Sequence, residues 1–325
     1  MRHPTFSASP AALLAAAAFV LLAAGCGYDA TPVPQPVASA TPSAAPATTP
    51  PACDDALESY APTGALPSPG SLPAGSTMAE IRDRGRLVAG VSADTFLLGS
   101  RNPFTGKIEG FDIDMVKQVA EAIFGDEDAY QLRVITSADR LPVLQADEVD
   151  IVVRNMTINC ARWLDIAFSA EYYRSGQKLL VRRDSGITGI DDLDGVAVCA
   201  PAASTSYDNL RRVAPDAIAV TATTHTGCLL KFQQGEVDAI TGDDTVLAGL
   251  AAQDPYAEVL ADDAFTDEPY GIGVNAEHVD LVRFINGVLE QMRADGSWER
   301  SYDTWLAPTL GRSPGQPRPE YGRTP

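Results

Sequence analysis

Residues 149–173 read VDIVVRNMTINCARWLDIAFSAEYY, and this stretch holds both a strand and an unusually placed charge. Its opening residues, 149–153, form a short apolar run that is typical of a buried β-strand. Arg162 lies one turn past an apolar run and just before a cluster of aromatic residues. The chain has a formal net charge of −19, so a cation this close to buried surface indicates a site for a local negative group.

Strands and helices alternate on both sides of this stretch. We expect buried strands at 86–91, 131–135 and 149–153, with an amphipathic helix at 114–124 between the first two. A second set of strands, at 195–200, 217–223 and 237–242, alternates with helical segments at 206–213 and 226–235. The pattern predicts an α/β protein with two similar lobes and a ligand cleft between them.

The composition limits the classes of partner. A chain of 325 residues with 45% apolar content is long enough for two ordinary domains with real cores. It has only 24 Lys and Arg against 43 Asp and Glu, which argues against nucleic-acid binding, because that affinity comes mostly from cations on phosphates. An anionic ligand must therefore be held by a few local donors.

Both ends of the chain are expected to lie outside the folded region. Residues 1–25 resemble a bacterial lipoprotein signal peptide, after which Cys26 would become the lipidated first residue; a plain export signal with an incidental cysteine is the alternative. Residues 26–77 are rich in Pro and Ala, which favours an extended tether. The tail at 312–325 is expected to be irregular.

Six stretches carry a resemblance to a known family. They are GKIEGFDIDM (106–115), residues 149–173 quoted above, GVAVCAPAASTS (195–206), GEVDAITGDDTVLAGL (235–250), EPYGIGV (268–274) and DGSWERSYDTWL (295–306). In this order they resemble the bacterial extracellular solute-binding proteins of family 3, the amino-acid receptors of ATP-binding-cassette (ABC) importers, and in particular their acidic-amino-acid branch.

The resemblance implies a two-lobed, type II periplasmic-binding-protein-like fold. Lobe 1 would comprise 78–174 and 272–311, and lobe 2 would comprise 175–271. Hinge crossovers are expected near 174–176 and 268–271. The implied protein is a monomer, lipid-anchored to the outer face of the cell membrane, that delivers its ligand to an ABC permease.

Three residues of the quoted stretch are implied to bind the ligand. Arg162 would fork onto the ligand's α-carboxylate, since a planar guanidinium suits this geometry, and Thr157 would add a hydroxyl and an amide. Asn155 is counted with them. The alternative for Arg162 is a structural ion pair with Asp165 or Glu171.

Lobe 2 is implied to supply donors to the same carboxylate. Ser204 or Thr205, at the start of a helix, would offer backbone amides and a hydroxyl, although these hydroxyls can also simply cap the helix. The family usually has glycine before this pair, and Ala203 replaces it here.

The ligand's other groups are also assigned through the resemblance. Asp243 matches the residue that pairs with the α-ammonium, while Asp244 would face away, because adjacent residues leaving a strand point to opposite sides. Phe96 aligns with the aromatic that lies against the ligand, although an isolated aromatic is more often part of a core.

Arg140 bears on the choice of substrate. In acidic-amino-acid members an arginine at this position binds the side-chain carboxylate. The alternative is an ion pair with Asp139 or Asp147. Arg101 is a weaker candidate for the same task.

Four cysteines remain after Cys26, and they allow three pairings. Export favours disulfides, and no CxxC spacing or nearby histidine supports a metal. With the lobes assigned as above, Cys199 and Cys228 share lobe 2, so we favour Cys53–Cys160 and Cys199–Cys228.

Three function classes follow. The leading interpretation is a binding protein for glutamate or aspartate, with asparagine or glutamine as alternatives, without cofactor and without enzymatic activity. An amino-acid sensor for a signalling membrane protein is a second class. A dehydratase-like enzyme is a third, but no general acid emerges from the motifs, and His225 and His278 lie in no nucleophile motif.

Overall fold

The computed structural model describes residues 53–261 and 263–324. The expected signal peptide, Cys26 and the tether up to residue 52 lie outside the described residues. Within the described part of the chain, no helix is both long enough and apolar enough to cross a membrane.

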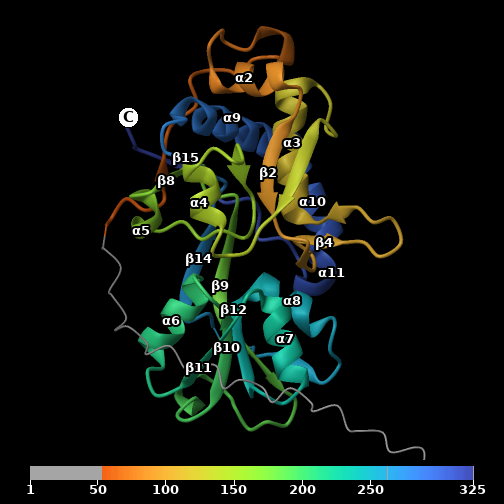
Figure 1. The fold of residues 1–325 in the computed structure, drawn as a ribbon, viewed down its shortest axis with the longest axis vertical. Helices are drawn as coiled ribbons and strands as arrows, with labels where there is room; N and C mark the ends of the chain where they lie inside the picture. The colour runs from red at the N-terminus through yellow and green to blue at the C-terminus, as the bar shows by residue number, and fades with distance from the viewer. Residues whose placement is uncertain (1–52, 262, 325) are drawn as a thin grey trace, which may run out of the picture. The chain divides into compact units, whose positions relative to one another are not determined.

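Lobe 1 is the part of the molecule built around a five-stranded sheet with the order β6-β2-β7-β15-β8 (Figure 1). The parallel strands β2, β6 and β7 meet an antiparallel strand, β15, that comes from far along the chain. These strands are β2 (Leu87–Val91), β6 (Tyr130–Val134), β7 (Ile151–Val152), β8 (Ile166–Phe168) and β15 (Gly273–Asn275). A small sheet adds β3 (Asp94–Thr95), β4 (Gly99–Arg101) and β5 (Ile108–Glu109).

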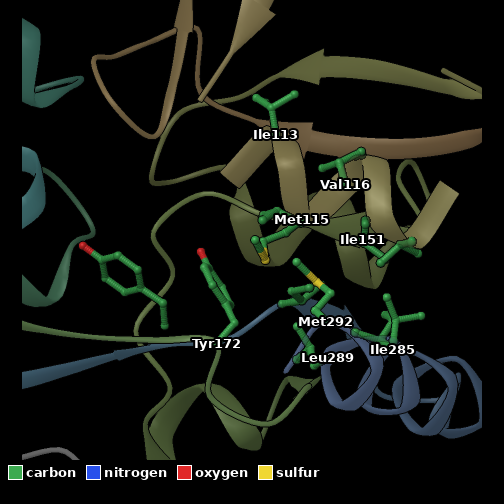
Figure 2. Packing of buried hydrophobic residues seen from close by; sticks show 14 of the residues in the cluster. Ile113, Met115, Val116, Ile151, Tyr172, Ile285, Leu289 and Met292 are labelled. Carbon is green, nitrogen blue, oxygen red and sulfur yellow. The ribbon is translucent and has the colours of Figure 1, made fainter. Parts of the chain in front are cut away.

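The two longest helices of lobe 1, α3 (Phe111–Phe124) and α9 (Val279–Asp295), each bury an apolar face in the core of the lobe. Figure 2 shows Met115 of α3 near Met292 of α9, and both side chains are buried, together with Ile113, Val116, Ile285 and Leu289. Such interdigitated burial stabilises the lobe. The helices are α2 (Thr77–Arg84), α3 (Phe111–Phe124), α4 (Arg140–Gln145), α5 (Cys160–Trp163), α9 (Val279–Asp295), α10 (Ser297–Trp305) and α11 (Ala307–Leu310).

Lobe 2 is built around a sheet with the order β11-β10-β12-β9-β13, in which β14 also pairs with β9. Its strands are β9 (Tyr173–Arg182), β10 (Ala197–Pro201), β11 (Ile218–Ala222), β12 (Ala239–Asp243), β13 (Ala257–Val259) and β14 (Thr266–Tyr270). Its helices are α6 (Thr205–Val213), α7 (His225–Gln233) and α8 (Asp244–Ala251), with a 3-10 turn, η2 (Ile190–Asp192). The β-α alternation is the one expected from the sequence.

Two antiparallel strands connect the lobes. β9 follows β8 of lobe 1, and β14 precedes β15 of lobe 1, with Tyr173 opposite Tyr270 and Ser175 opposite Glu268. The expected hinge positions, 174–176 and 268–271, fall in this pair of strands and just beyond its end. Hinge motion itself stays a prediction.

The two terminal segments differ from the expectation. Residues 53–77 are not an extended tether, and the tail is not wholly irregular, because β1 (Glu58–Ser59) pairs in parallel with β16 (Glu320–Tyr321). A 3-10 turn, η1 (Pro69–Ser71), follows β1, and Leu72 is buried in the lobe 1 core. The few apolar residues of this Pro-rich segment dock on lobe 1, which a composition-based reading overlooks.

Both disulfides have the pairing that we favoured. Cys53 and Cys160 join the N-terminal segment to lobe 1, with Cα atoms 5.8 Å apart. Cys199 and Cys228 link β10 to α7 inside lobe 2, with Cα atoms 5.5 Å apart.

Candidate ligand-binding site

Arg162 is buried at the end of a single helical turn. The side chain of Asn159 caps α5 by accepting from the Arg162 amide, and the Arg162 guanidinium donates from Nη1 to the Thr157 carbonyl at 2.6 Å. Glu171 pairs instead with Arg174 at 2.6 Å, and no carboxylate among the described residues lies within 4.0 Å of Arg162. The alternative of a structural ion pair is therefore wrong.

Thr157 and Thr205 face each other from the two lobes, with their hydroxyl oxygens 3.1 Å apart. Both hydroxyls donate to Oε2 of Glu268, at 2.6 and 2.8 Å. The hydroxyls are thus engaged by the protein's own carboxylate, contrary to the expectation that they are open to a ligand. The first amides of α6 have no partner within that helix, so they are the donors that remain for a ligand.

Ser204 caps α6 and does not contribute a free hydroxyl. Its Oγ accepts from the Tyr207 amide at 3.1 Å and donates to the Pro201 carbonyl at 2.7 Å. Ala203 beside it has φ of 56°, the left-handed region that glycine occupies without strain. Ala203 therefore adopts the loop conformation that the family's usual glycine would have, with a small backbone strain.

Asp243 and Asp244 point in different directions, as expected. Asp244 accepts from the Ser175 hydroxyl and the Thr245 amide, whereas Asp243 accepts from the Tyr270 hydroxyl at 2.7 Å. Burial raises the pKa of Asp243 to about 7, and the nearby charge of Glu268 acts in the same direction. Oδ1 of Asp243 is buried and has no hydrogen-bond partner in the described part of the protein.

Asn155 lies opposite Asp243 in a strained backbone conformation. Its φ is 36°, and its amide is held by Oδ2 of Asp112 at 2.9 Å. Tyr172 donates to the same carboxyl group at 2.7 Å, while burial raises the pKa of Asp112 to about 6. Nδ2 of Asn155 reaches Asp243 at 3.5 Å, and its Oδ1 is a second buried acceptor without a partner among the described atoms. Strain of this kind is common at functional sites.

Two further arginines of lobe 1 are buried, and neither forms an ion pair with another described residue. Arg140 is 3% exposed and donates to the Ser137 carbonyl at 3.0 Å and, across the lobes, to the Ala203 carbonyl at 3.4 Å. Arg154 is 4% exposed and donates to the Ile135 carbonyl and the Ser137 hydroxyl. Burial lowers the pKa of Arg140 well below its usual range, and the charges of Arg162 and Arg154 lower it further.

The alternatives for Arg140 do not hold. Asp139 accepts from Thr136, and Asp147 from Asn275 and His278. Among the described residues no carboxylate lies within 4.0 Å of the Arg140 guanidinium, although desolvation makes an unpaired buried charge costly.

Phe96 and Arg101 are not part of this buried set. Phe96 is 43% exposed, and Arg101 is exposed and donates to the Gly106 carbonyl within its own hairpin. Both line an open groove of about 660 Å³ that also includes Phe104 and Trp305. Phe96 and Arg101 are exposed, whereas Arg140 and Arg162 are buried. The structure therefore does not support the expectation that Phe96 and Arg101 contact the ligand.

The sequence analysis missed four residues of the site. Glu268 and Tyr270 stand in the EPYGIGV stretch, and Arg154 directly precedes Asn155. His225 begins α7, and its Nε2 is buried without a partner among the described residues; burial and the charge of Arg154 lower its pKa to about 3. The quoted motifs contained the first three, but their burial became visible only in the fold.

The fold and this site together define a class of protein. Two α/β lobes are joined by two crossing strands, and buried cations and acceptors from both lobes converge between them, as in extracytoplasmic solute receptors of type II. The sequence profile described as bacterial extracellular solute-binding proteins, family 3, matches residues 87–308. The chain belongs to this family.

Several relatives are similar over most of their length. The ABC transporter glutamine-binding protein GlnH of Bacillus subtilis is 39% identical over 231 residues, covering 71% of this chain and 84% of that protein. A glutamine-binding protein of Geobacillus stearothermophilus is 42% identical, covering 61% of this chain and 76% of that protein. The glutamate-binding protein GluB of Corynebacterium efficiens is 33% identical, covering 67% and 78%.

Solved structures share the fold. The ancestral amino acid-binding protein AncCDT-1, a precursor of cyclohexadienyl dehydratase, is 30% identical with a TM-score of 0.65, covering 71% of this chain and all of that one. A mutant of the arginine-binding protein ArgBP from T. maritima is 28% identical with a TM-score of 0.66, covering 71% of this chain and 99% of that one.

Proposed function

We propose that this protein captures an amino acid between its lobes and presents it to an ABC permease. The preferred ligands are glutamate and aspartate, with glutamine and asparagine as weaker ligands. The observation that carries the proposal is the juxtaposition of buried, unpartnered acceptors on Asp243 and Asn155 with buried guanidiniums that have no carboxylate partner among the described residues.

The α-ammonium group of the ligand would meet the acceptors. Oδ1 of Asp243 and Oδ1 of Asn155 come from different lobes, and an ammonium brings three donors to them. The α-carboxylate would meet Arg162 and the first amides of α6. A ligand that touches both lobes at once favours the closed arrangement, because it binds that state better than the open one.

The ligand's side chain would meet Arg140 and Arg154. Neither guanidinium forms an ion pair within 4.0 Å with a described carboxylate, and both are buried. They therefore suit a side-chain carboxylate better than a neutral amide, because the carboxylate offsets more of their desolvation. The relatives named above are divided, since the names of two specify glutamine and that of the third glutamate. For this chain the buried arginines favour the acidic ligands.

Anchoring and delivery complete the proposal. Lipidation at Cys26 would hold the receptor at the outer face of the membrane, beside its permease. A sensor role would use the same ligand site, and transport measured in cells that lack the receptor would distinguish the two.

Calorimetric titration with glutamate, aspartate, glutamine and asparagine tests the ligand assignment. Arg162→Ala should weaken all four ligands, since all carry an α-carboxylate. Arg140→Ala should weaken glutamate and aspartate most, by on the order of 3–5 kcal/mol, because one partner of a buried charge pair is lost. Arg101→Ala is the matched control, since this arginine is exposed.

Two results would contradict the proposal at different levels. If none of the twenty amino acids raises the melting temperature of the parent protein, amino-acid capture is wrong, because a ligand at a hundred times its dissociation constant adds about 2.7 kcal/mol. If Arg140→Ala keeps parent affinity for glutamate and aspartate, only the acidic preference is wrong.

A further inference from the structure

The helix that carries Arg162 is too short to hold its own position. α5 spans only Cys160–Trp163, and a single turn has little stability in isolation, because nucleation fixes several residues for one hydrogen bond. The Asn159 cap satisfies one amide at the start of this turn. The position of Arg162 therefore depends on what holds Cys160 and Trp163, in addition to the hydrogen bond of its guanidinium to the Thr157 carbonyl.

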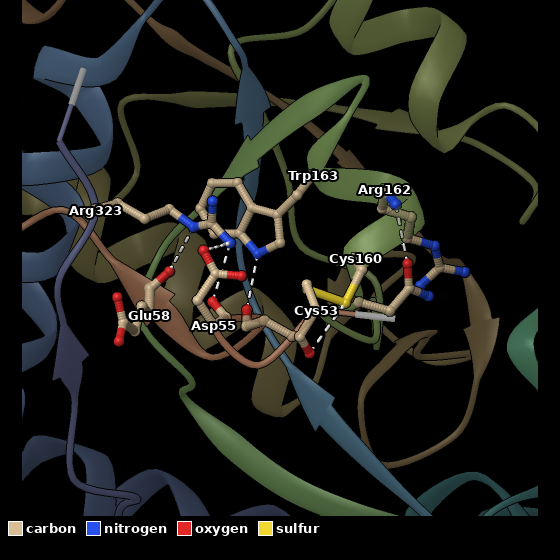
Figure 3. Close-up of a disulfide and its surroundings, with 9 residues drawn as sticks. Cys53, Asp55, Glu58, Cys160, Arg162, Trp163 and Arg323 are labelled. Carbon is tan, nitrogen blue, oxygen red and sulfur yellow. Dashed lines mark hydrogen bonds and ion pairs between the residues drawn. A yellow bond between two sulfur atoms is a disulfide. The ribbon is translucent and has the colours of Figure 1, made fainter. Parts of the chain in front are cut away.

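Cys160 and Trp163 are both held by the terminal segments of the chain (Figure 3). Cys160 forms the disulfide with Cys53. Nε1 of Trp163 donates to the Ala56 carbonyl at 2.8 Å, and its ring meets Tyr60 edge-on with centroids 6.2 Å apart. We call residues 53–60 together with 320–323 the terminal clasp.

Arg323 closes the terminal clasp from the C-terminal side. Its guanidinium lies over the Trp163 ring, 3.8 Å from the centroid, which is a cation–π contact, as Figure 3 shows. It also donates to the Glu58 carbonyl at 2.8 Å and the Asp55 carbonyl at 2.9 Å, and it pairs with the Asp55 carboxylate at 3.4 Å. The β1–β16 pairing lies beside these contacts.

The clasp is itself fixed to the body of lobe 1. The Ser59 hydroxyl donates to the Phe168 carbonyl at 2.8 Å, and Asn286 donates to Ser59 and to the Tyr60 carbonyl. The same Asn286 accepts from the Ala170 amide at 2.7 Å. α5 is thus held between the terminal clasp on one side and the sheet of lobe 1 on the other.

We propose that the terminal clasp positions Arg162 for the ligand, with Trp163 and Arg323 as positioning residues and Cys53–Cys160 as the covalent link. The inference rests on the proposed function, because it concerns the affinity of the same site. Loosening the clasp should leave the fold of both lobes intact and lower ligand affinity through Arg162 alone, since a small misplacement of a forked contact weakens it strongly.

A double-mutant cycle in the full-length protein measures the coupling between Arg323 and Arg162 in ligand binding. Arg323→Ala should weaken glutamate binding about five- to tenfold in the parent, a coupling within the range seen for residues that act together. Arg162→Lys keeps the positive charge but cannot make the two-pronged guanidinium contact. In that background Arg323→Ala should cause no further loss of glutamate affinity. Arg312→Ala is the matched control, because this exposed arginine of the same tail makes no hydrogen bond or ion pair with another described residue.

Chemical reduction gives a second readout that requires no mutation. Cys53 is exposed, whereas Cys199 and Cys228 are 0% exposed, so a mild reductant should open Cys53–Cys160 first. Because the ligand favours the state in which the terminal clasp holds α5, saturating glutamate should slow that reduction. The rate is followed by alkylation of Cys53 and mass spectrometry.

The outcomes separate the two proposals. If the parent binds no amino acid, the proposed function falls and the clasp inference falls with it. If the parent binds glutamate but Arg323→Ala weakens it equally in both backgrounds, or if glutamate leaves the reduction rate of Cys53–Cys160 unchanged, only the clasp inference is overturned. A folding defect in Arg323→Ala would appear as a lowered melting temperature without ligand, and the reduction experiment would then decide.

Discussion

The two lobes bring opposite charges to the proposed ligand site, and their disulfides lie in different surroundings. Lobe 1 brings three buried arginines, Arg140, Arg154 and Arg162, and its disulfide ends at an exposed cysteine in the terminal segment. Lobe 2 brings Asp243 and places its disulfide wholly inside its core. One disulfide therefore holds the short helix that carries Arg162 in lobe 1, and the other joins a strand to a helix in lobe 2.

This difference separates the demands of stability from those of binding. The Cys199–Cys228 bond lies between β10 and α7 and reaches no residue of the proposed ligand set. The Cys53–Cys160 bond lies two residues from Arg162 along the chain. Cross-linking of a core mainly limits the unfolded chain, whereas cross-linking beside a ligand residue also limits the native arrangement of that residue.

Removing the lobe 2 disulfide should have a large effect on stability and little effect on binding. The double variant Cys199→Ala/Cys228→Ala should lower the free energy of unfolding by about 3.5 kcal/mol, as loop-closure entropy predicts for a sequence separation of 29 residues. Glutamate affinity of the folded variant should stay within about twofold of the parent, because distant sites act independently. Urea denaturation and calorimetric titration measure the two quantities.

A loss of affinity in the lobe 2 variant would contradict the contrast drawn between the two disulfides. A loss of affinity in the lobe 2 variant at temperatures where it is fully folded would mean that this disulfide also shapes the site. Cys53→Ala/Cys160→Ala is the matched variant, and it should lose affinity as well as stability.

Asp243→Asn should give the next largest effect, this time on binding. The variant should lose on the order of 2–3 kcal/mol of affinity for every amino acid, because the α-ammonium loses its buried charged partner. The ligand-free protein should be as stable as the parent or more stable, since a desolvated carboxyl group is replaced by a neutral amide. Asp244→Asn is the control, because its side chain faces Ser175. Equal losses in both variants would contradict the assignment.

The effect of a one-unit change in pH on stability should be smaller and should have a definite sign. Burial raises the pKa of Asp243 from 3.8 to about 7, so between about pH 4 and pH 7 the native state holds a proton that the unfolded state has lost. Stability without ligand should therefore fall as pH rises through this window, by at most about 1.4 kcal/mol per pH unit from this group. Asp112, with a pKa of about 6, acts in the same direction.

Ligand binding should reverse this preference at Asp243. The ammonium group favours the ionised carboxylate, so binding at pH 6 should release close to one proton, and affinity should rise up to about pH 7. Calorimetric titration at pH 6 in two buffers with different ionisation heats measures the proton count. Binding without proton release in the parent, or with equal release in Asp243→Asn, would be inconsistent with an ammonium at this carboxylate.

Local patterns in the sequence were enough to predict much of this protein. The alternation of apolar strands and amphipathic helices predicted the α/β architecture, since side-chain periodicity follows directly from backbone geometry. The motif stretches pointed to Arg162 and Asp243, and the resemblance to acidic-amino-acid members pointed to Arg140; all three side chains are buried. The disulfides could be predicted once each cysteine was assigned to a lobe.

Only the tertiary structure decided how distant residues meet. Thr157 and Glu268 are 111 residues apart in sequence, yet their hydrogen bond takes the Thr157 hydroxyl away from a ligand. Arg323 and Glu58 are separated by 265 residues and close the terminal clasp over Trp163. Periodicity reports which face of an element is buried, but not which distant element covers it. The position of Arg162 in an acidic sequence was enough to predict that it binds a negative group. Only the fold decided which other side chains surround it.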